Sequence, residues 1–162
     1  MPPSPVIWNF RLARPDDAVE ACTVLRRSIT ELCQADHGND PVILAAWLAN
    51  KTPEQVRSWI EANPLGFFVG SNSQGISAVG SVTLKGEIAL NYVAPWARYQ
   101  GVSKSLVGVM ERRAAALGHA SCFLTSTATA QAFYLACGYE NDGEAAVAFG
   151  GMRSYPMRRS IG

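Results

Sequence analysis

The chain has 162 residues, 48% of them hydrophobic, and its formal net charge is +1 at pH 7. This length and composition suit one domain with one sizeable core. The charges are nearly balanced, no long basic or acidic run occurs, and no apolar run reaches membrane-spanning length, so neither a nucleic-acid partner nor a membrane partner is expected.

The first third of the chain is predicted to form one strand followed by helices. Residues 6–14 alternate enough for a strand, and the proline and two aspartates that follow mark a helix start. The apolar positions of this helix recur at helical spacing as far as residue 32. Residues 34–40 are predicted as a loop and residues 41–50 as a short helix. Thr52 is expected to cap a further helix, because a proline follows it directly and a glutamine stands three residues after it.

From residue 66 onward the hydrophobic pattern changes from the helical period to the strand period. Residues 66–71 and 76–84 are predicted strands around a turn, and residues 86–93 are a third strand. Strict alternation divides this third strand into two faces, with Ile88, Leu90 and Tyr92 on one and Glu87, Ala89, Asn91 and Val93 on the other. Glu87 and Val93 are therefore expected to point to the same side.

The rest of the chain continues as helix, strand, helix and hairpin. A helix is predicted to begin at Gly101, and the later elements are expected at residues 121–127, 129–137 and 144–159. The order of elements predicts one mixed α/β domain over residues 1–162. Its strand–helix–strand unit from residue 86 to residue 126 implies a parallel or near-parallel strand pair.

The cysteines and the N-terminus indicate a reduced, metal-free protein. The spacing of Cys22, Cys33, Cys122 and Cys137 fits neither a metal knuckle nor a small disulfide scaffold. Cys33 and His37 lie one helical turn apart, but no second pair of ligands stands near them, so no metal is expected. The first ten residues lack the charged start and apolar stretch of a signal peptide, which together with reduced thiols predicts a cytoplasmic protein.

The turn that precedes the helix at Gly101 has the chemistry of an anion site. A helix N-terminus offers unpaired backbone N–H groups and the positive end of the helix dipole. The surrounding side chains add small size, hydroxyls and positive charge: Arg98, Gly101, Ser103, Lys104 and Ser105. A diphosphate suits such a site, although the same residues also fit an ordinary strand-to-helix turn with a solvated arginine. This turn contains only one glycine, so it matches neither the dinucleotide-binding fingerprint nor the P-loop pattern, which both need more.

Two motifs resemble the GNAT superfamily of N-acetyltransferases. The segment LNYVAPWARYQGVSKSLVGVMERRAAALG resembles the acyl-CoA-binding segment of this family, whose Arg/Gln-x-x-Gly-x-Gly/Ala pattern falls on residues 98–103. The segment TATAQAFYLACGYE resembles the family pattern Asn-x-x-Ala-x-x-Phe-Tyr-x-x-x-Gly-Phe, with matches at Ala130, Phe133, Tyr134, Gly138 and Tyr139. The two matches cover roughly residues 86–140 at the spacing of the family, and the order of elements agrees over the whole chain.

The resemblance implies a GNAT-like acyl-CoA N-acyltransferase fold, a mostly antiparallel central sheet splayed at one parallel pair with helices on both faces. It implies acetyl-CoA as co-substrate, and no metal. The residues implied to bind it are Tyr92, Val93, Arg98, Tyr99, Gln100, Gly101, Val102, Ser103, Lys104, Ser105, Thr127, Ala130 and Phe133. Two residues depart from the family pattern: Ser103 replaces the usual glycine or alanine, and Thr127 stands where asparagine is common.

Acyl transfer to an amine needs a base for the amine, stabilisation of the oxyanion and an acid for the departing thiolate. The resemblance implies Tyr134 as the acid, while the alternative is an aromatic residue packed in the core. Glu87 is the candidate base, acting through water because roughly 20 Å of strand separates it from Val93. The alternative interpretation is that Glu87 is an exposed charged residue at the start of a strand, with no role in catalysis. Asn91 lies nearer the thioester and is expected to orient the amine.

The acceptor side is less defined. In this family the loop over the acceptor cleft corresponds to the region of Glu31, Asp36, His37 and Asp40. The first 97 residues hold nine acidic and seven basic residues. A mildly acidic acceptor half would suit a cationic amine. Trp47 and Trp59 fall in helical stripes and are expected in the core, whereas Trp96 is left open between pocket and core.

The expected function is acetyl transfer from acetyl-CoA to a primary amine of a small molecule or peptide. A non-catalytic acyl-CoA sensor on the same fold is the alternative, but a sensor has no need of both Glu87 and Tyr134. A weaker alternative is an unrelated nucleotide-phosphate-binding protein, which would bind ATP as tightly as CoA. The oligomeric state is left open, a homodimer included.

Overall fold

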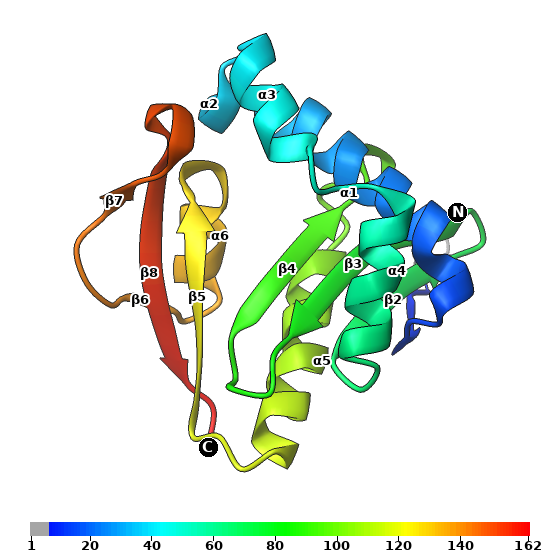
Figure 1. Ribbon diagram of the computed structural model, residues 1–162. Helices are drawn as coiled ribbons and strands as arrows, with labels where there is room; N and C mark the ends of the chain where they lie inside the picture. The colour runs from blue at the N-terminus through cyan, green and yellow to red at the C-terminus, as the bar shows by residue number, and fades with distance from the viewer. Residues whose placement is uncertain (1–6) are drawn as a thin grey trace, which may run out of the picture.

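Two antiparallel sheets form the centre of the molecule (Figure 1). The computed structural model describes residues 7–162, so residue 6 of the first predicted strand lies outside the described part. The first sheet has the order β1 (Asn9–Leu12), β2 (Phe67–Asn72), β3 (Gly75–Val82) and β4 (Ile88–Val93). The second has the order β5 (Ser121–Thr127), β8 (Arg153–Ser160) and β6 (Glu140–Asn141), and β7 (Ala146–Val147) also pairs with β8.

The two sheets meet where β4 and β5 run parallel. An isolated parallel bridge joins Glu87 to Phe123, and the Phe123 N–H donates to the Gly86 carbonyl at 3.2 Å. From there the two strands diverge toward their C-terminal ends (Figure 1). The predicted mixed fold, with its mostly antiparallel sheet splayed at one parallel pair, is therefore confirmed.

Helices cover both faces of the first sheet. α1 (Ala18–Leu32) and α4 (Pro53–Ala62) bury their apolar residues against one face, and α5 (Val102–Ala116) buries its residues against the other. α6 (Ala128–Ala136) follows β5 and shares the core of α5. The short helices α2 (Gln34–His37) and α3 (Pro41–Leu48) extend from the end of α1.

Local sequence signals explain where several helices begin. The Thr52 hydroxyl accepts a hydrogen bond from the Gln55 N–H at 3.1 Å, and Pro53 occupies the first position of α4, as predicted. Asp40 caps α3 in the same way, because its carboxylate accepts the Val42 N–H at 2.9 Å. Side chains at the starts of α3 and α4 thus satisfy backbone N–H groups that have no intrahelical partner.

Strand β4 departs from the strict alternation that its sequence predicts. Ser81 of β3 pairs with Leu90 and Val82 pairs with Ile88, so Ala89 is the extra residue of a bulge. Ile88 consequently packs in the core of α5, whereas Leu90 packs in the core of α1 and α4. The expectation that Ile88 and Leu90 share a face is wrong. Alternation from Ile88 turns Glu87 toward the α1 face, away from the face of Val93.

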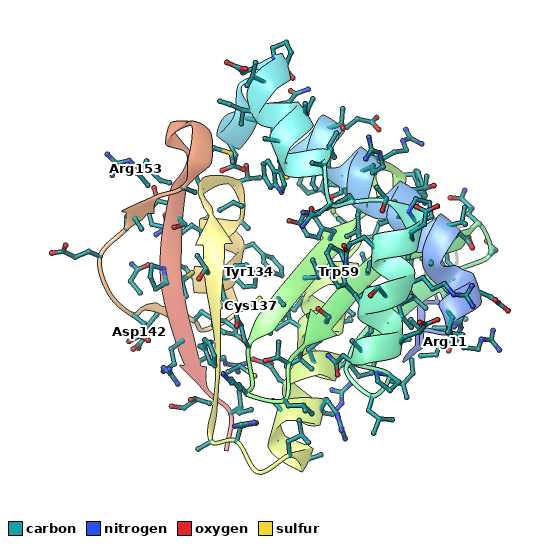
Figure 2. The ribbon with its side chains drawn as sticks, viewed as in Figure 1. Arg11, Trp59, Tyr134, Cys137, Asp142 and Arg153 are labelled. Atoms are coloured by element: carbon teal, nitrogen blue, oxygen red, sulfur yellow. The ribbon has the colours of Figure 1, made fainter. Side chains whose placement is uncertain are left out.

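Other differences from the predicted elements are small. The predicted loop over residues 34–40 contains the single turn of α2, and the two-residue strand β6 has no clear sequence pattern. The four cysteines are free thiols, three of them buried, as expected. Trp47 is buried, and Trp59 of α4 is partly buried and packs against the core that α4 shares with α1 and the first sheet (Figure 2), so both expectations are confirmed.

Candidate active site

A cavity of about 580 Å³ lies where β4 and β5 diverge. It is bounded by α1, β4, the turn before α5, β5 and the start of α6. Because β4 is splayed from β5 here, the cavity connects the face of the sheet that carries α1 with the face that carries α5 and α6. Its lining includes every residue expected to bind the co-substrate except Ser105: Tyr92, Val93, Arg98, Tyr99, Gln100, Gly101, Val102, Ser103, Lys104, Thr127, Ala130 and Phe133.

The turn before α5 opens this cavity to a large ligand. Gly101 is the residue before the first turn of α5 and has a φ of +76°. A Cβ atom built on Gly101 would meet nothing within 4 Å, so the backbone is open to close approach at this point. The Ser105 N–H donates to the Gly101 carbonyl at 3.2 Å within the first turn of α5, and Ser105 lies off the cavity wall.

Tyr99 is held in the same turn in a conformation that side chains rarely adopt. Its φ is +65°, in the left-handed region, and its side chain is 89% exposed. The Arg98 guanidinium lies over the Tyr99 ring at 4.6 Å from the centroid. The turn thus presents an exposed aromatic ring and a cation at the mouth of the cavity.

Tyr134 lies inside the cavity, between β4 and β5 (Figure 2). Its hydroxyl oxygen accepts a hydrogen bond from Asn91 Nδ2 of β4 at 3.0 Å. Burial raises the pKa of Tyr134 to about 12, although the hydrogen bond from Asn91 acts in the opposite direction. The phenol is therefore protonated at neutral pH and holds a proton that it can donate into the cavity.

Thr127 has a structural task as well as a place in the cavity wall. Its hydroxyl oxygen accepts the Ala130 N–H at 3.2 Å and so caps α6. A capping oxygen that accepts from the helix retains its O–H hydrogen, which remains able to donate to a ligand. Sequence comparison with the asparagine common in the family could not show this capping role.

Three residues expected on the acceptor side lie off the cavity wall. Glu31 is exposed on α1 and forms an ion pair with Arg27 at 2.7 Å. Asp36 accepts hydrogen bonds from the backbone N–H and the hydroxyl of Thr129, and thereby ties α2 to the first turn of α6. Both carboxylates thus have partners within the protein, and neither lies on the wall of this cavity.

His37 is a core residue. It is 1% exposed, its Nε2 lies 2.8 Å from the Ile29 carbonyl, and its Nδ1 accepts the Asn39 N–H at 3.0 Å. A ring nitrogen that accepts a backbone N–H carries no hydrogen, so Nε2 is the nitrogen that donates, and both ring nitrogens have partners within the protein. The expectation that His37 contacts the acceptor is corrected by this burial.

Glu87 lies at the junction of the two sheets, one residue before the cavity wall begins at Ile88. Its backbone N–H donates to the Thr83 hydroxyl at 3.2 Å, which fixes the chain at this point. At about 3.3 Å per residue, Glu87 lies roughly 13 Å along the strand from Asn91. The structure therefore separates Glu87 from Tyr134 both along β4 and across its faces.

The sequence analysis missed the α1 wall of the cavity, formed by Ser28, Leu32 and Cys33. Ser28 and Leu32 are four residues apart and fall on the buried side of α1, a helical spacing that the sequence does contain. Burial raises the pKa of Cys33 to about 12, so this wall carries no charge at neutral pH. Trp96, left open by the sequence, donates from Nε1 to the Ser77 hydroxyl at 2.9 Å.

Within residues 7–162, no group of three or more histidine, cysteine, aspartate or glutamate side chains is arranged to hold a metal ion. None of the helices in that range combines the length and apolar character required to cross a membrane.

Comparison with known proteins assigns these features to a family. Residues 33–161 match the family model described as an acetyltransferase (GNAT) domain. No curated protein matches the chain.

Among solved structures, the chain is similar to a GCN5-related N-acetyltransferase from Rhodopseudomonas palustris, with a TM-score of 0.83 and 18% identity over 94% of this chain and 95% of that one. It is also similar to the PaiA N-acetyltransferase from Thermoplasma acidophilum in complex with coenzyme A, with a TM-score of 0.73 and 15% identity over 95% and 99% of the two chains. A putative acetyltransferase from Salmonella typhimurium with acetyl-CoA gives a TM-score of 0.72 and 14% identity over 96% and 94%. At these identities the structures establish the shared fold.

Proposed function

The chain belongs to the GNAT acetyltransferase family, and we propose that it transfers an acetyl group from acetyl-CoA to a primary amine of a small molecule or peptide. The observation that carries this proposal is the protonated Tyr134 hydroxyl, buried in a cavity whose other end opens at Gly101. Structures of the same fold are described with coenzyme A or acetyl-CoA, which supports the choice of co-substrate.

The diphosphate of acetyl-CoA is assigned to the first turn of α5. Backbone N–H groups at a helix start attract anions, and the open backbone at Gly101 allows a phosphate to approach them. Arg98 and Lys104 line the same end of the cavity and add positive charge. From there the pantetheine arm would follow the cavity toward Val93 and Tyr134.

The two substrates are proposed to approach β4 from opposite faces. The amine enters on the α1 side, and the thioester arrives on the side of α5 and α6. The neutral amine attacks the thioester carbon, a new C–N bond forms, and the C–S bond breaks. Tyr134 gives its proton to the departing thiolate and regains one from solvent. The attacking nitrogen loses one proton to a water molecule. Glu87, on the face of β4 opposite Tyr134, accepts a proton from that water.

Binding of acetyl-CoA and thiol release test the proposal together. Acetyl-CoA at a hundredfold excess over its Kd should stabilise the protein by about 2.7 kcal/mol in a thermal shift assay. A screen of primary amines should then show release of free CoA thiol. Binding without thiol release from any amine would favour the non-catalytic sensor, and absence of any shift at millimolar acetyl-CoA would reject the proposal.

Gly101→Asp should abolish the thermal shift, because its carboxylate would crowd and repel the diphosphate. Gly118→Asp is the matched control. Gly118 follows the opposite end of α5, also has a positive φ, and likewise has nothing within 4 Å of a built Cβ. It should retain the full shift, so the pair separates loss of binding from backbone strain.

The uncharged α1 wall suggests which amines to compare first. Nα-acetyl-lysinamide and Nε-acetyl-lysinamide contain the same atoms and differ in which amine is free. At pH 7 about 14% of an α-amine but only about 0.04% of an ε-amine is neutral, from ordinary pKa values of about 7.8 and 10.4. We expect the free α-amine to react faster, by up to roughly 300-fold, with a smaller difference at higher pH. Faster reaction of the ε-amine at pH 7 would contradict entry in the neutral form.

A further inference from the structure

Asn91 connects β4 with the buried phenol of α6 across the cavity. Its Nδ2 donates to the Tyr134 hydroxyl oxygen at 3.0 Å, although 43 residues separate the two positions in sequence. The other atom of the same amide, Oδ1, is buried and has no hydrogen-bond partner among the described residues. Both atoms belong to a residue that lines the cavity.

The bond from Nδ2 determines where the phenol proton can point. When the hydroxyl oxygen accepts from Asn91, the O–H hydrogen is not used in that bond and must be directed elsewhere. In a cavity that holds the thioester, this leaves the proton available to the departing sulfur. Asn91 also stabilises the phenolate that remains after the transfer, which is the reason its hydrogen bond acts against the raised pKa of Tyr134.

The unpaired Oδ1 calls for a separate explanation. Nearly all buried polar atoms in folded proteins have a partner, because an unpaired acceptor away from water is costly. Oδ1 is an acceptor, so its missing partner must be a donor. The proposed substrates bring N–H donors in two places, on the attacking amine and on the amides of the pantetheine arm.

We infer that Asn91 is a positioning residue whose Nδ2 holds Tyr134 for proton transfer and whose Oδ1 receives an N–H of a bound substrate. The inference rests on the proposed function. It assigns the two ends of one side-chain amide to the acid and to the ligand. Through Asn91, binding of the substrate is linked to the orientation of the Tyr134 hydroxyl.

A double-mutant cycle tests the link between Asn91 and Tyr134. Asn91→Ala should lower kcat by about 10-fold or more in the wild-type background, because the acid is no longer held. In the Tyr134→Phe background the same change should cost almost nothing further, since the group on which Nδ2 acts is already gone. An equal loss of kcat in both backgrounds would overturn this half of the inference.

Asn91→Ser provides a second variant if the alanine variant folds poorly. It keeps a small polar side chain but lacks both Nδ2 and Oδ1, and its single hydroxyl is shorter than the amide, so the same cycle applies to it. The cooperative melting of each ligand-free variant shows that it is folded. A purely structural role for Asn91 would lower kcat by the same factor in the wild-type and Tyr134→Phe backgrounds, and this outcome would overturn the inference.

Two binding constants identify the donor at Oδ1. Both are measured in the Tyr134→Phe background, with and without Asn91→Ala, so that the effect on the acid is absent. A higher KM for the amine with unchanged Kd for acetyl-CoA assigns the donor to the amine, and the reverse assigns it to pantetheine. No change in either constant would overturn the role of Oδ1. Failure of the proposed function is distinct, because the wild-type protein itself would then release no thiol.

Discussion

The two ends of the β4–β5 pair show how one pair of strands supports both structure and chemistry. At the Glu87 end the strands are joined through backbone, by the bridge to Phe123 and the bond from the Phe123 N–H to the Gly86 carbonyl. At the Asn91 end the strands have separated, and the cavity lies between them. Backbone groups that leave a ladder need other partners. The open end is therefore where a ligand can pair with the protein.

Two glycines mark the same contrast. Gly86 and Gly101 both have positive φ, at +86° and +76°. A Cβ on Gly86 would meet the His119 ring at 3.2 Å and the Ser121 carbonyl at 3.3 Å, whereas a Cβ on Gly101 would meet nothing within 4 Å. Gly86 allows the chain to pack closely, and Gly101 leaves space for a ligand. A similar local conformation thus serves packing at one end and binding at the other.

The largest effect is expected at the open end, from Tyr134→Phe. The change keeps the ring and removes only the proton donor, so kcat should fall by roughly 10²-fold or more while the Kd for acetyl-CoA is unchanged. Tyr139→Phe is the matched control. Tyr139 packs edge-on against Tyr134 at 5.6 Å and donates to Glu111 at 3.0 Å, outside the cavity wall. It should lose stability but keep kcat, and unchanged kcat in Tyr134→Phe would refute the acid role.

Glu87→Gln tests whether the closed end also takes part in the reaction. The amide keeps the size of the side chain but cannot take up a proton. We expect kcat at pH 7 to fall by about 10²-fold, the low end of the usual cost of losing a general base, because the proton must pass through water. The rate should recover as pH rises, because hydroxide can then take the proton that Glu87 no longer accepts. If the pH–rate profile of Glu87→Gln overlays that of the wild type, Glu87 serves only the junction between the sheets.

Gly86→Ala should weaken the closed end without affecting binding. The added methyl group meets two close neighbours at a positive φ, so the free energy of unfolding should drop by about 1–3 kcal/mol. The Kd for acetyl-CoA should remain as in the wild type. Gly118→Ala introduces similar backbone strain without close neighbours. Its free energy of unfolding in urea should therefore fall less, and the difference between the two variants measures the cost of crowding at Gly86. A weaker acetyl-CoA affinity in Gly86→Ala would show that the two ends are coupled.

The smallest effect is expected at Tyr99, in the turn of the open end. Replacing a strained left-handed tyrosine by glycine removes a cost of about 1–2 kcal/mol, part of which the greater freedom of glycine in the unfolded chain offsets. Tyr99→Gly should therefore raise the free energy of unfolding of the ligand-free protein by a few tenths to about 1 kcal/mol, measured by urea denaturation. A lower stability would mean that the stacked Arg98 holds the turn more strongly than the strain opposes it.

Sequence alone predicted the parts of the molecule that depend on near neighbours. Thr52 and Pro53 start α4 because a cap and a proline act within one helical turn. Gly101 precedes a helix for the same local reason, and four of the residues implied for co-substrate binding, from Val102 to Ser105, follow it directly. The resemblance in two motifs then placed Tyr134 in the same site as Gly101, because the spacing between the motifs determines which helix each motif occupies.

Tertiary structure decided what depends on partners far along the chain. The bulge at Ala89 arises in the pairing of β4 with β3, and it reversed the expected face of Glu87. The bond between Asn91 and Tyr134 spans 43 residues, and that between Asp36 and Thr129 spans 93. No period in the sequence encodes such pairs, because they form only when separate elements pack and buried polar groups must find whichever partners the packing brings within reach.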